Sequence, residues 1–218
     1  EESEKNGLHP QLKLIPEVVL KAEPKILDEF HIEEDRDNFD YIYLLEEEKD
    51  YKGNKYRNKR NFTNRFKRLY SSSYKLIELV DPETQKQILD LFDHWQKLKE
   101  KENEEVKNEL LAIRKMLDLA NELKLICIGI YINKKLIAFS INELLLGGYA
   151  INLFEKADIT YQGIFPYLRS ITASYLLEQG GKFLNHEQDL GIEGLRKSKM
   201  SYNPQFFLKK YTISKKKS

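Results

Sequence analysis

The chain has 218 residues, of which 41% are hydrophobic and 33% are charged, and its formal net charge is +1. This length allows one large domain, or one domain with part of a second, and this composition excludes a disordered chain. No apolar run approaches the roughly 20 residues that cross a bilayer, so the sequence predicts no transmembrane segment.

The small net charge conceals a strong separation of charges within the first half of the chain. Residues 28–50 contain eleven acidic and two basic residues, whereas residues 51–77 contain nine basic residues and no acidic one. Two interpretations are open. The two segments neutralise each other across a shared surface, or the basic segment binds an anionic partner such as RNA, phosphate or a phospholipid head group.

Cysteine and histidine usage argues against disulfide and metal chemistry. The single cysteine, Cys127, lies in the apolar run LICIGIYI, which suits a small buried side chain better than a reactive thiolate. One cysteine and four scattered histidines give no zinc-ligand spacing, so we expect no metal site. A lone thiol fits a reducing compartment, and we therefore expect a cytoplasmic location.

The N-terminal third is predicted to contain two helical segments and a strand. Residues 16–30 read as a short helix interrupted at a proline, and residues 36–45 alternate as a strand does. Residues 54–70 predict a basic helix whose apolar face comprises Phe62, Phe66, Leu69 and Tyr70. Helical projection places Lys59 on the same face, where it either lies along the edge of the core or binds an anion in a cleft.

Two long helices and a run of antiparallel strands are expected next. Asp81 is the predicted N-cap of the first helix, with Pro82 at its first position. The second helix has an apolar stripe that extends from Val106 to Ala120. The period then changes to that of strands, with a hairpin that turns at residues 133–134.

The last third adds a strand, a helix and two further strands. Residues 147–157 predict the strand, and residues 163–180 predict a helix closed by Gly180 or Gly181. Residues 182–186 and 205–213 predict the last two strands. This order of elements predicts an α+β fold.

A polar stretch near the C-terminus, NHEQDLGIEGLRKSK, departs from the pattern of a packed strand. Read as a continuation of the strand, it places Asn185, Glu187 and Asp189 on one side, which a strand facing a core does not usually do. Either these groups line a cleft, or Asp189 caps the following helix while Asn185 and Gln188 satisfy the backbone where the strand bends.

Four separated motifs resemble the phosphatidylglycerol lysyltransferase C-terminal-domain family, which has a GNAT-like fold. They are RDNFDYIY, GNKYRNKRN, NHEQDLGIEGLRKSK and SYNP, and the resemblance extends over about residues 12–213. This family is similar to the Fem-type aminoacyl-tRNA-dependent transferases, which have two GNAT-like units in tandem. The resemblance implies that residues 80–218 form the second unit. Residues 1–79 would then hold the end of the first unit and a basic joining helix, with most of the first unit outside this chain.

The resemblance also implies a function. We expect a soluble GNAT-like acyltransferase that moves an aminoacyl group from aminoacyl-tRNA, or from another activated acyl donor, to an amine or hydroxyl acceptor. Expected partners are tRNA and a small-molecule, lipid head-group or peptide acceptor. No cofactor is expected, because the turn YQGIFPYL departs from the small-residue pyrophosphate loop of acetyl-coenzyme A enzymes and acyl-coenzyme A is therefore the less expected donor.

The candidate site residues lie mainly in the polar stretch and in the basic helix. Glu187 and Asp189 are the catalytic candidates, as proton acceptors or as ligands of the donor's amino group. Arg36 and Asp37 are expected at the joint between the two units. The substrate-binding candidates are Lys59, Arg60, Asn61, Asn185, Gln188, Arg196, Lys197 and Lys199.

Two other functions remain open at this point. The chain could be a non-catalytic module that binds RNA or another polyanion through its basic helices, or a structural fragment that lacks its catalytic partner unit. The identity of the donor and the acceptor, and the oligomeric state, do not follow from the sequence.

Overall fold

The structure, a computed structural model, describes residues 5–7, 10–99 and 104–216. The chain divides into two compact units, of which one combines the N-terminal segment up to Ile42 with the C-terminal segment from His186 onward, and the other comprises residues 43–185. We call them the terminal unit and the central unit. These units are defined by contacts within the chain. They do not test the division at residue 79 into two repeated GNAT-like units, which stays a prediction.

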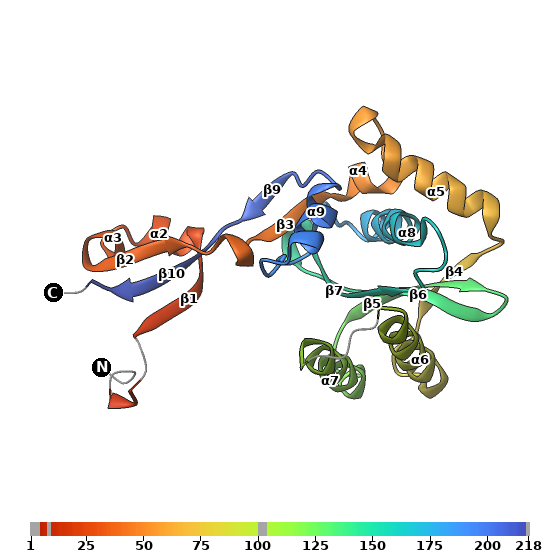
Figure 1. Ribbon diagram of the computed structural model, residues 1–218, viewed down its shortest axis with the longest axis horizontal. Coiled ribbons are helices and arrows are strands. Elements are labelled where there is room, and N and C mark those ends of the chain that lie inside the picture. The colour runs from red at the N-terminus through yellow and green to blue at the C-terminus, as the bar shows by residue number, and fades with distance from the viewer. Residues whose placement is uncertain (1–4, 8–9, 100–103, 217–218) are drawn as a thin grey trace. The chain divides into compact units, whose positions relative to one another are not determined.

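The terminal unit pairs the two ends of the chain (Figure 1). Strand β10 lies between β1 and β2 and is antiparallel to both, and β9 is antiparallel to β3. The expected helix over residues 16–30 is present as two short helices, α2 and α3, but the strands on either side of them were not predicted. The elements are β1 (Gln11–Pro16), α2 (Glu17–Ala22), α3 (Ile26–Glu29), β2 (Phe30–Glu34), η1 (Arg36–Asn38), β3 (Asp40–Leu44), α9 (Glu193–Met200), β9 (Phe206–Leu208) and β10 (Lys210–Lys215).

Strand β3 begins later than the sequence pattern indicates. The prediction of a strand from residue 36 was wrong, because Arg36–Asn38 forms a turn of 3₁₀ helix and the strand starts at Asp40. Residues 40–43 are all buried, so β3 has no solvent face. The expected single strand at residues 205–213 is likewise two strands, β9 and β10, which pair with different neighbours.

The central unit is built on five strands in the order β4-β5-β6-β7-β8, of which β7 and β8 are parallel and the rest antiparallel. Figure 1 shows α6 and α7 on one face of these strands and α8 with α5 on the other. Its elements are α4 (Leu45–Asp50), η2 (Asn54–Tyr56), α5 (Arg57–Leu69), β4 (Ser73–Ile77), α6 (Pro82–Lys99), α7 (Glu104–Asp118), β5 (Leu125–Ile132), β6 (Lys135–Leu144), η3 (Leu146–Gly148), β7 (Tyr149–Ala157), α8 (Ile164–Glu178) and β8 (Phe183–Asn185).

Several local predictions in the central unit are confirmed. The Asp81 carboxylate accepts a hydrogen bond from the Thr84 amide at 3.0 Å and so caps α6. Asn133 and Lys134 both have positive φ, as the tight turn between β5 and β6 requires. Gly180, with φ +87°, follows the end of α8.

The predicted apolar face of the basic helix was only half right. Phe66 is fully buried, but Phe62 and Leu69 are 48% and 50% exposed. Helix α5 instead packs through a face that includes Thr63 and Phe66, and the Phe66 ring stacks on Tyr167 of α8 at 4.6 Å. A buried threonine therefore takes the place that the pattern assigned to a larger apolar side chain.

Candidate functional site

The polar stretch forms a loop rather than a strand face. Strand β8 ends at Asn185, and Glu187 has a left-handed φ of +54°, so the predicted alternation of three polar residues on one side of a strand was wrong. Asn185 is buried and paired with β7 in the central unit, whereas Glu187 and Asp189 belong to the terminal unit.

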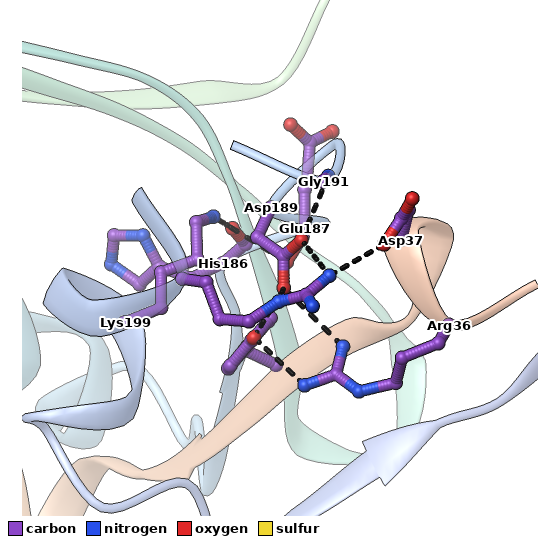
Figure 2. A network of polar contacts seen from close by, with 9 residues as sticks. Arg36, Asp37, His186, Glu187, Asp189, Gly191 and Lys199 are labelled. Atoms are coloured by element: carbon purple, nitrogen blue, oxygen red, sulfur yellow. Dashed lines mark hydrogen bonds and ion pairs between the residues drawn. The ribbon is translucent and has the colours of Figure 1, made fainter. Parts of the chain in front are cut away.

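Asp189 is the centre of the polar contacts in the terminal unit (Figure 2). Its side chain is fully buried. One carboxylate oxygen accepts bonds from the Tyr41 hydroxyl at 2.5 Å and from Arg196 Nε at 2.9 Å, and Arg36 Nη1 lies 3.3 Å from it. The other oxygen accepts bonds from the Gly191 amide at 2.9 Å and Arg196 Nη2 at 2.8 Å. Both oxygens of Asp189 are therefore engaged within the protein.

The two arginines around Asp189 are themselves fixed in place. Arg36 donates to the Tyr41 hydroxyl at 3.0 Å and lies over the Phe207 ring at 4.9 Å. Arg196 also donates to Asp37 at 2.6 Å. Sequence analysis placed Arg36 and Asp37 at a joint between units. It did not pair Arg36 with Asp189 or Asp37 with Arg196, because the two members of each pair are 153 and 159 residues apart in the chain and no local spacing connects them.

The loop around Asp189 depends on one glycine. Gly191 has φ +73°, and a Cβ built there would lie 2.8 Å from Asp37 Oδ2. A larger residue would therefore be strained and would press on the group that Arg196 contacts. Asp189 does not cap helix α9 as one alternative proposed; it accepts the amide of Gly191 instead, and Ile192 is the N-cap residue.

The basic residues of α9 differ in what they contact. Lys199 donates to the backbone carbonyls of His186 and Glu187, and these bonds tie the loop after β8 to α9. Lys197 is exposed and forms a surface ion pair with Glu193 at 2.6 Å. Figure 2 shows the half-buried Glu187 with its carboxylate turned away from Arg36. Gln188 is also half-buried.

The electrostatics keep Asp189 ionised. Burial opposes its charge, but hydrogen bonds from Arg196, Tyr41 and Gly191 outweigh burial and hold the pKa of Asp189 well below its usual range. A carboxylate with a low pKa and no open oxygen is a poor proton acceptor. This geometry argues against the expectation that Asp189 is a catalytic proton acceptor.

In the central unit, the predicted substrate residues of the basic helix separate into different environments. Arg60 donates to the carbonyl oxygens of Tyr51 at 2.5 Å and Gly53 at 3.1 Å, which fixes the turn before α5. Asn61 is exposed and Lys59 is half-buried. The acidic and basic segments are partly neutralised by each other, since Lys55 pairs with Glu47 at 2.8 Å.

Helix α5 also presents a basic stripe that sequence analysis did not single out. At 100° per residue, residues 57, 61, 64, 65 and 68 lie opposite the buried face, and all five are exposed. Three of them are arginines, for which the structure shows no ion-pair partner among the residues it describes: Arg57, Arg65 and Arg68. Their exposed side chains suit contacts with phosphate groups.

The N-terminus of α8 is covered by α5. Gly163 precedes α8 with φ +85°, and a Cβ there would lie 2.2 Å from the Phe62 carbonyl oxygen. Backbone atoms of α5 therefore occupy the space beside the turn YQGIFPYL, the turn that sequence analysis compared with the pyrophosphate loop of acetyl-coenzyme A enzymes.

Two further features were searched for in the described residues. Within residues 5–7, 10–99 and 104–216, no group of three or more His, Cys, Asp or Glu side chains is placed to hold a metal ion. Among the helices within those ranges, none has the length and apolarity needed to span a membrane.

Comparison with solved structures defines the class of the fold. A conserved protein of unknown function from Bacteroides thetaiotaomicron is 31% identical, with a TM-score of 0.87 over 99% of this chain and 72% of that one. L-PGS from Bacillus licheniformis is 15% identical, with a TM-score of 0.70 over 100% of this chain and 71% of that one. FemX is 9% identical, with a TM-score of 0.61 over 91% and 68%. The fold is thus α+β and GNAT-like, as in L-PGS and FemX.

A family model described as phosphatidylglycerol lysyltransferase, C-terminal, matches residues 11–214. The chain belongs to this family, which confirms the resemblance drawn from its four motifs. Comparison with the curated proteins finds no match.

Proposed function

We propose that this chain is an aminoacyltransferase that takes an aminoacyl group from a charged tRNA and passes it to an amine or hydroxyl acceptor. The observation that carries the proposal is the family match over residues 11–214, which includes the whole Asp189 loop. Such a reaction runs in the compartment that holds charged tRNA, so the proposal includes a cytoplasmic location.

The proposed roles follow the geometry of the terminal unit. Glu187 is the catalytic candidate, as the proton acceptor of the attacking group or as the ligand of the donor's amino group. Asp189 is a positioning residue, since it holds Arg36 and Arg196 and through them shapes the loop. Gln188 and Asn185 remain candidates for substrate contact through their amides.

Donor binding is proposed for the exposed cations. The arginines of the α5 stripe and Lys197 of α9 supply phosphate contacts. Acyl-coenzyme A is the weaker donor hypothesis, because Phe62 lies against the turn before α8. The proposed division of the chain at residue 79 places the basic helix at the end of the first GNAT-like unit.

A second function is favoured by one observation, the α5 stripe. Three exposed arginines without an ion-pair partner in the described residues would serve equally well in a non-catalytic RNA-binding module.

A thermal-shift comparison separates the two functions. A ligand at about 100 times its dissociation constant stabilises the folded protein by about 2.7 kcal/mol, which raises the Tm of a chain of this size by roughly 5 to 10 °C. The transferase predicts a larger shift with charged than with uncharged tRNA. Equal shifts would favour the binding module, and a shift with acyl-coenzyme A alone would contradict both.

A further inference from the structure

The central unit contains a buried ion pair that the proposed function has not used. Glu48 of α4 is fully buried and Arg169 of α8 is 4% exposed, and an oxygen of Glu48 lies 2.5 Å from Arg169 Nη2. The guanidinium carbon of Arg169 lies 4.6 Å from the centre of the Tyr43 ring. Charges buried in this way cost free energy to desolvate and are kept in proteins only when paired.

A second cation, Lys59 of α5, belongs to the same cluster. It is half-buried. Its burial and the positive charge of Arg169 lower the pKa of Lys59, and the negative charge of Glu48 opposes them in part. The resulting pKa of Lys59 is about 8. Burial and the negative charges of Glu155 and Glu47 raise the pKa of Glu48, and the positive charges of Arg169 and Lys59 oppose them in part. The resulting pKa of Glu48 is about 7. Burial thus lowers the pKa of the amine and raises the pKa of the carboxyl, which brings both values toward neutral pH.

Two buried hydroxyls accompany these charges. Thr63 lies one helical turn after Lys59 on α5, and Thr172 lies one turn after Arg169 on α8. Both side chains are more than nine-tenths buried, and neither Oγ1 has a hydrogen-bond partner among the residues the structure describes. Buried polar atoms are normally satisfied, so hydroxyls of this kind indicate a site that receives a polar group.

The helices around the cluster are held firmly together. The Tyr51 hydroxyl donates to the Pro166 carbonyl at 3.1 Å, and Ser170 Oγ donates to the Lys49 carbonyl at 2.5 Å. These bonds fix α4 and the turn after it on α8, while Phe66 fixes α5 on α8. The backbone that carries Lys59 is therefore fixed relative to α4 and α8, which carry its charged neighbours Glu48 and Arg169.

We propose that Lys59 is a proton-transfer group of the central unit, with Glu48 and Arg169 as its positioning pair and the two threonine hydroxyls as contacts for a polar group of the acceptor. The proposal rests on the proposed aminoacyl transfer. It gives the attacking group's proton to Lys59 and leaves Glu187 the other of its two proposed roles, that of ligand of the donor's amino group.

The step balances without a further reactant. The acceptor's amine or hydroxyl attacks the ester carbonyl carbon, forming a C–N or C–O bond, and its proton passes to the neutral Lys59 amine. The bond from the carbonyl carbon to the ribose oxygen breaks, and the Lys59 ammonium returns a proton to that oxygen. Lys59 acts first as base and then as acid, and its net charge is unchanged over the cycle.

The lowered pKa of the Lys59 amine can be tested on the wild-type protein by competitive labelling with trace acetic anhydride across pH 6 to 11. Mass spectrometry then follows Lys59, with the exposed Lys67 of the same helix as the internal reference. We expect the labelling of Lys59 to rise around pH 8, compared with about 10.4 for an ordinary lysine. Labelling of Lys59 that rises only above pH 10 would overturn the inference, whatever the activity.

The role is tested by Lys59→Arg, which keeps the positive charge but cannot release a proton at pH 8. We expect transfer from charged tRNA to fall by about 10² or more, with unchanged affinity for uncharged tRNA. Lys67→Arg is the control and should retain full transfer.

Transfer that survives Lys59→Arg would overturn the role. If Lys59 of the wild-type chain is labelled near pH 8 but no aminoacyl group is transferred, the proposed function is wrong and so is the proton-transfer role. The lowered pKa of Lys59 would still be confirmed by that result.

Discussion

At the scale of single residues, Asp189 shows how one buried carboxylate organises a loop. It joins η1, β3 and α9 through contacts with Arg36, Tyr41 and Arg196. Removing a buried charge leaves its partners uncompensated, which costs about 3–5 kcal/mol. We therefore expect Asp189→Asn to lower the free energy of unfolding by about 3 kcal/mol in urea denaturation. The surface variant Lys197→Ala should change it by less than about 0.5 kcal/mol, and equal effects of the two variants would contradict the account.

The same carboxylate predicts a pH dependence. The pKa of Asp189 is lower in the folded protein than in the unfolded chain, where it is near 3.9. Its contribution to stability is therefore complete above the unfolded pKa and is lost as the pH falls below about 4. Urea denaturation at pH 7 and pH 3 should show a smaller loss for Asp189→Asn than for the wild type. A loss of the same size in both would rule out this assignment.

Arg196 tests whether the shape of the cation matters. Its Nε and Nη2 contact Asp189, and Nη2 also contacts Asp37. The single nitrogen of a lysine cannot reproduce this fork. We expect Arg196→Lys to lower stability by about 1–3 kcal/mol, and a neutral result would show that charge alone suffices.

These residue-scale contacts lay largely beyond sequence analysis. The motifs containing Asp189 and Arg36 were recognised, but the pairing of residues about 150 positions apart leaves no local periodicity. The expectation that Asp189 is catalytic followed from its residue type, from its place in the polar stretch and from the family resemblance. Sequence does not reveal that five donors from its own unit surround it.

At the scale of elements, the contact between α5 and α8 is the feature most open to test. Gly163→Ala would place a methyl group 2.2 Å from the Phe62 carbonyl oxygen in a backbone with φ +85°. Strain and overpacking together should cost about 2–4 kcal/mol, measured by thermal or urea unfolding.

Gly194→Ala is the matched control, since the space around Gly194 in α9 is open. It should leave stability unchanged or raise it by up to about 1 kcal/mol. A tolerated Gly163→Ala would contradict the close approach of α5 to the turn before α8.

Elements with their own local signals were predictable. The Asp81 cap, the Asn133–Lys134 turn and the glycine after α8 each follow from the backbone chemistry of two or three residues. Strands β1 and β2 were missed because their partner, β10, lies at the other end of the chain. The face of α5 was misassigned because its helical pattern fits two neighbouring faces, and packing against Tyr167 selects the one that contains Thr63.

At the scale of the whole molecule, the α+β fold class was predictable from the order of the elements, and the family from four motifs that occur along most of the chain. The choice between a transferase and a binding module was not, since both need basic helices. Both functions require tRNA binding by the basic stripe of α5, and the salt dependence of the tRNA-binding constant tests this requirement. Replacing Arg57, Arg65 and Arg68 with Gln should weaken tRNA binding and reduce the slope of log K against log[salt] by about 2–3.

The control for this experiment makes the same change in net charge elsewhere. Lys107, Arg114 and Lys115 are exposed on α7, and their replacement with Gln should leave the slope unchanged. An equal reduction in both variants would mean that overall charge, rather than the α5 stripe, attracts RNA.

The measurement that tests the central claim most directly is transfer of label from tRNA. The protein is incubated with a tRNA pool charged with radiolabelled amino acids and with a panel of lipid head-group, peptide and small amine acceptors. We expect label to leave the tRNA and appear on an acceptor. Glu187→Gln should reduce the rate by about 10² or more, with unchanged affinity for uncharged tRNA. Tight binding of tRNA with no label transferred to any acceptor would contradict the account and favour the binding module.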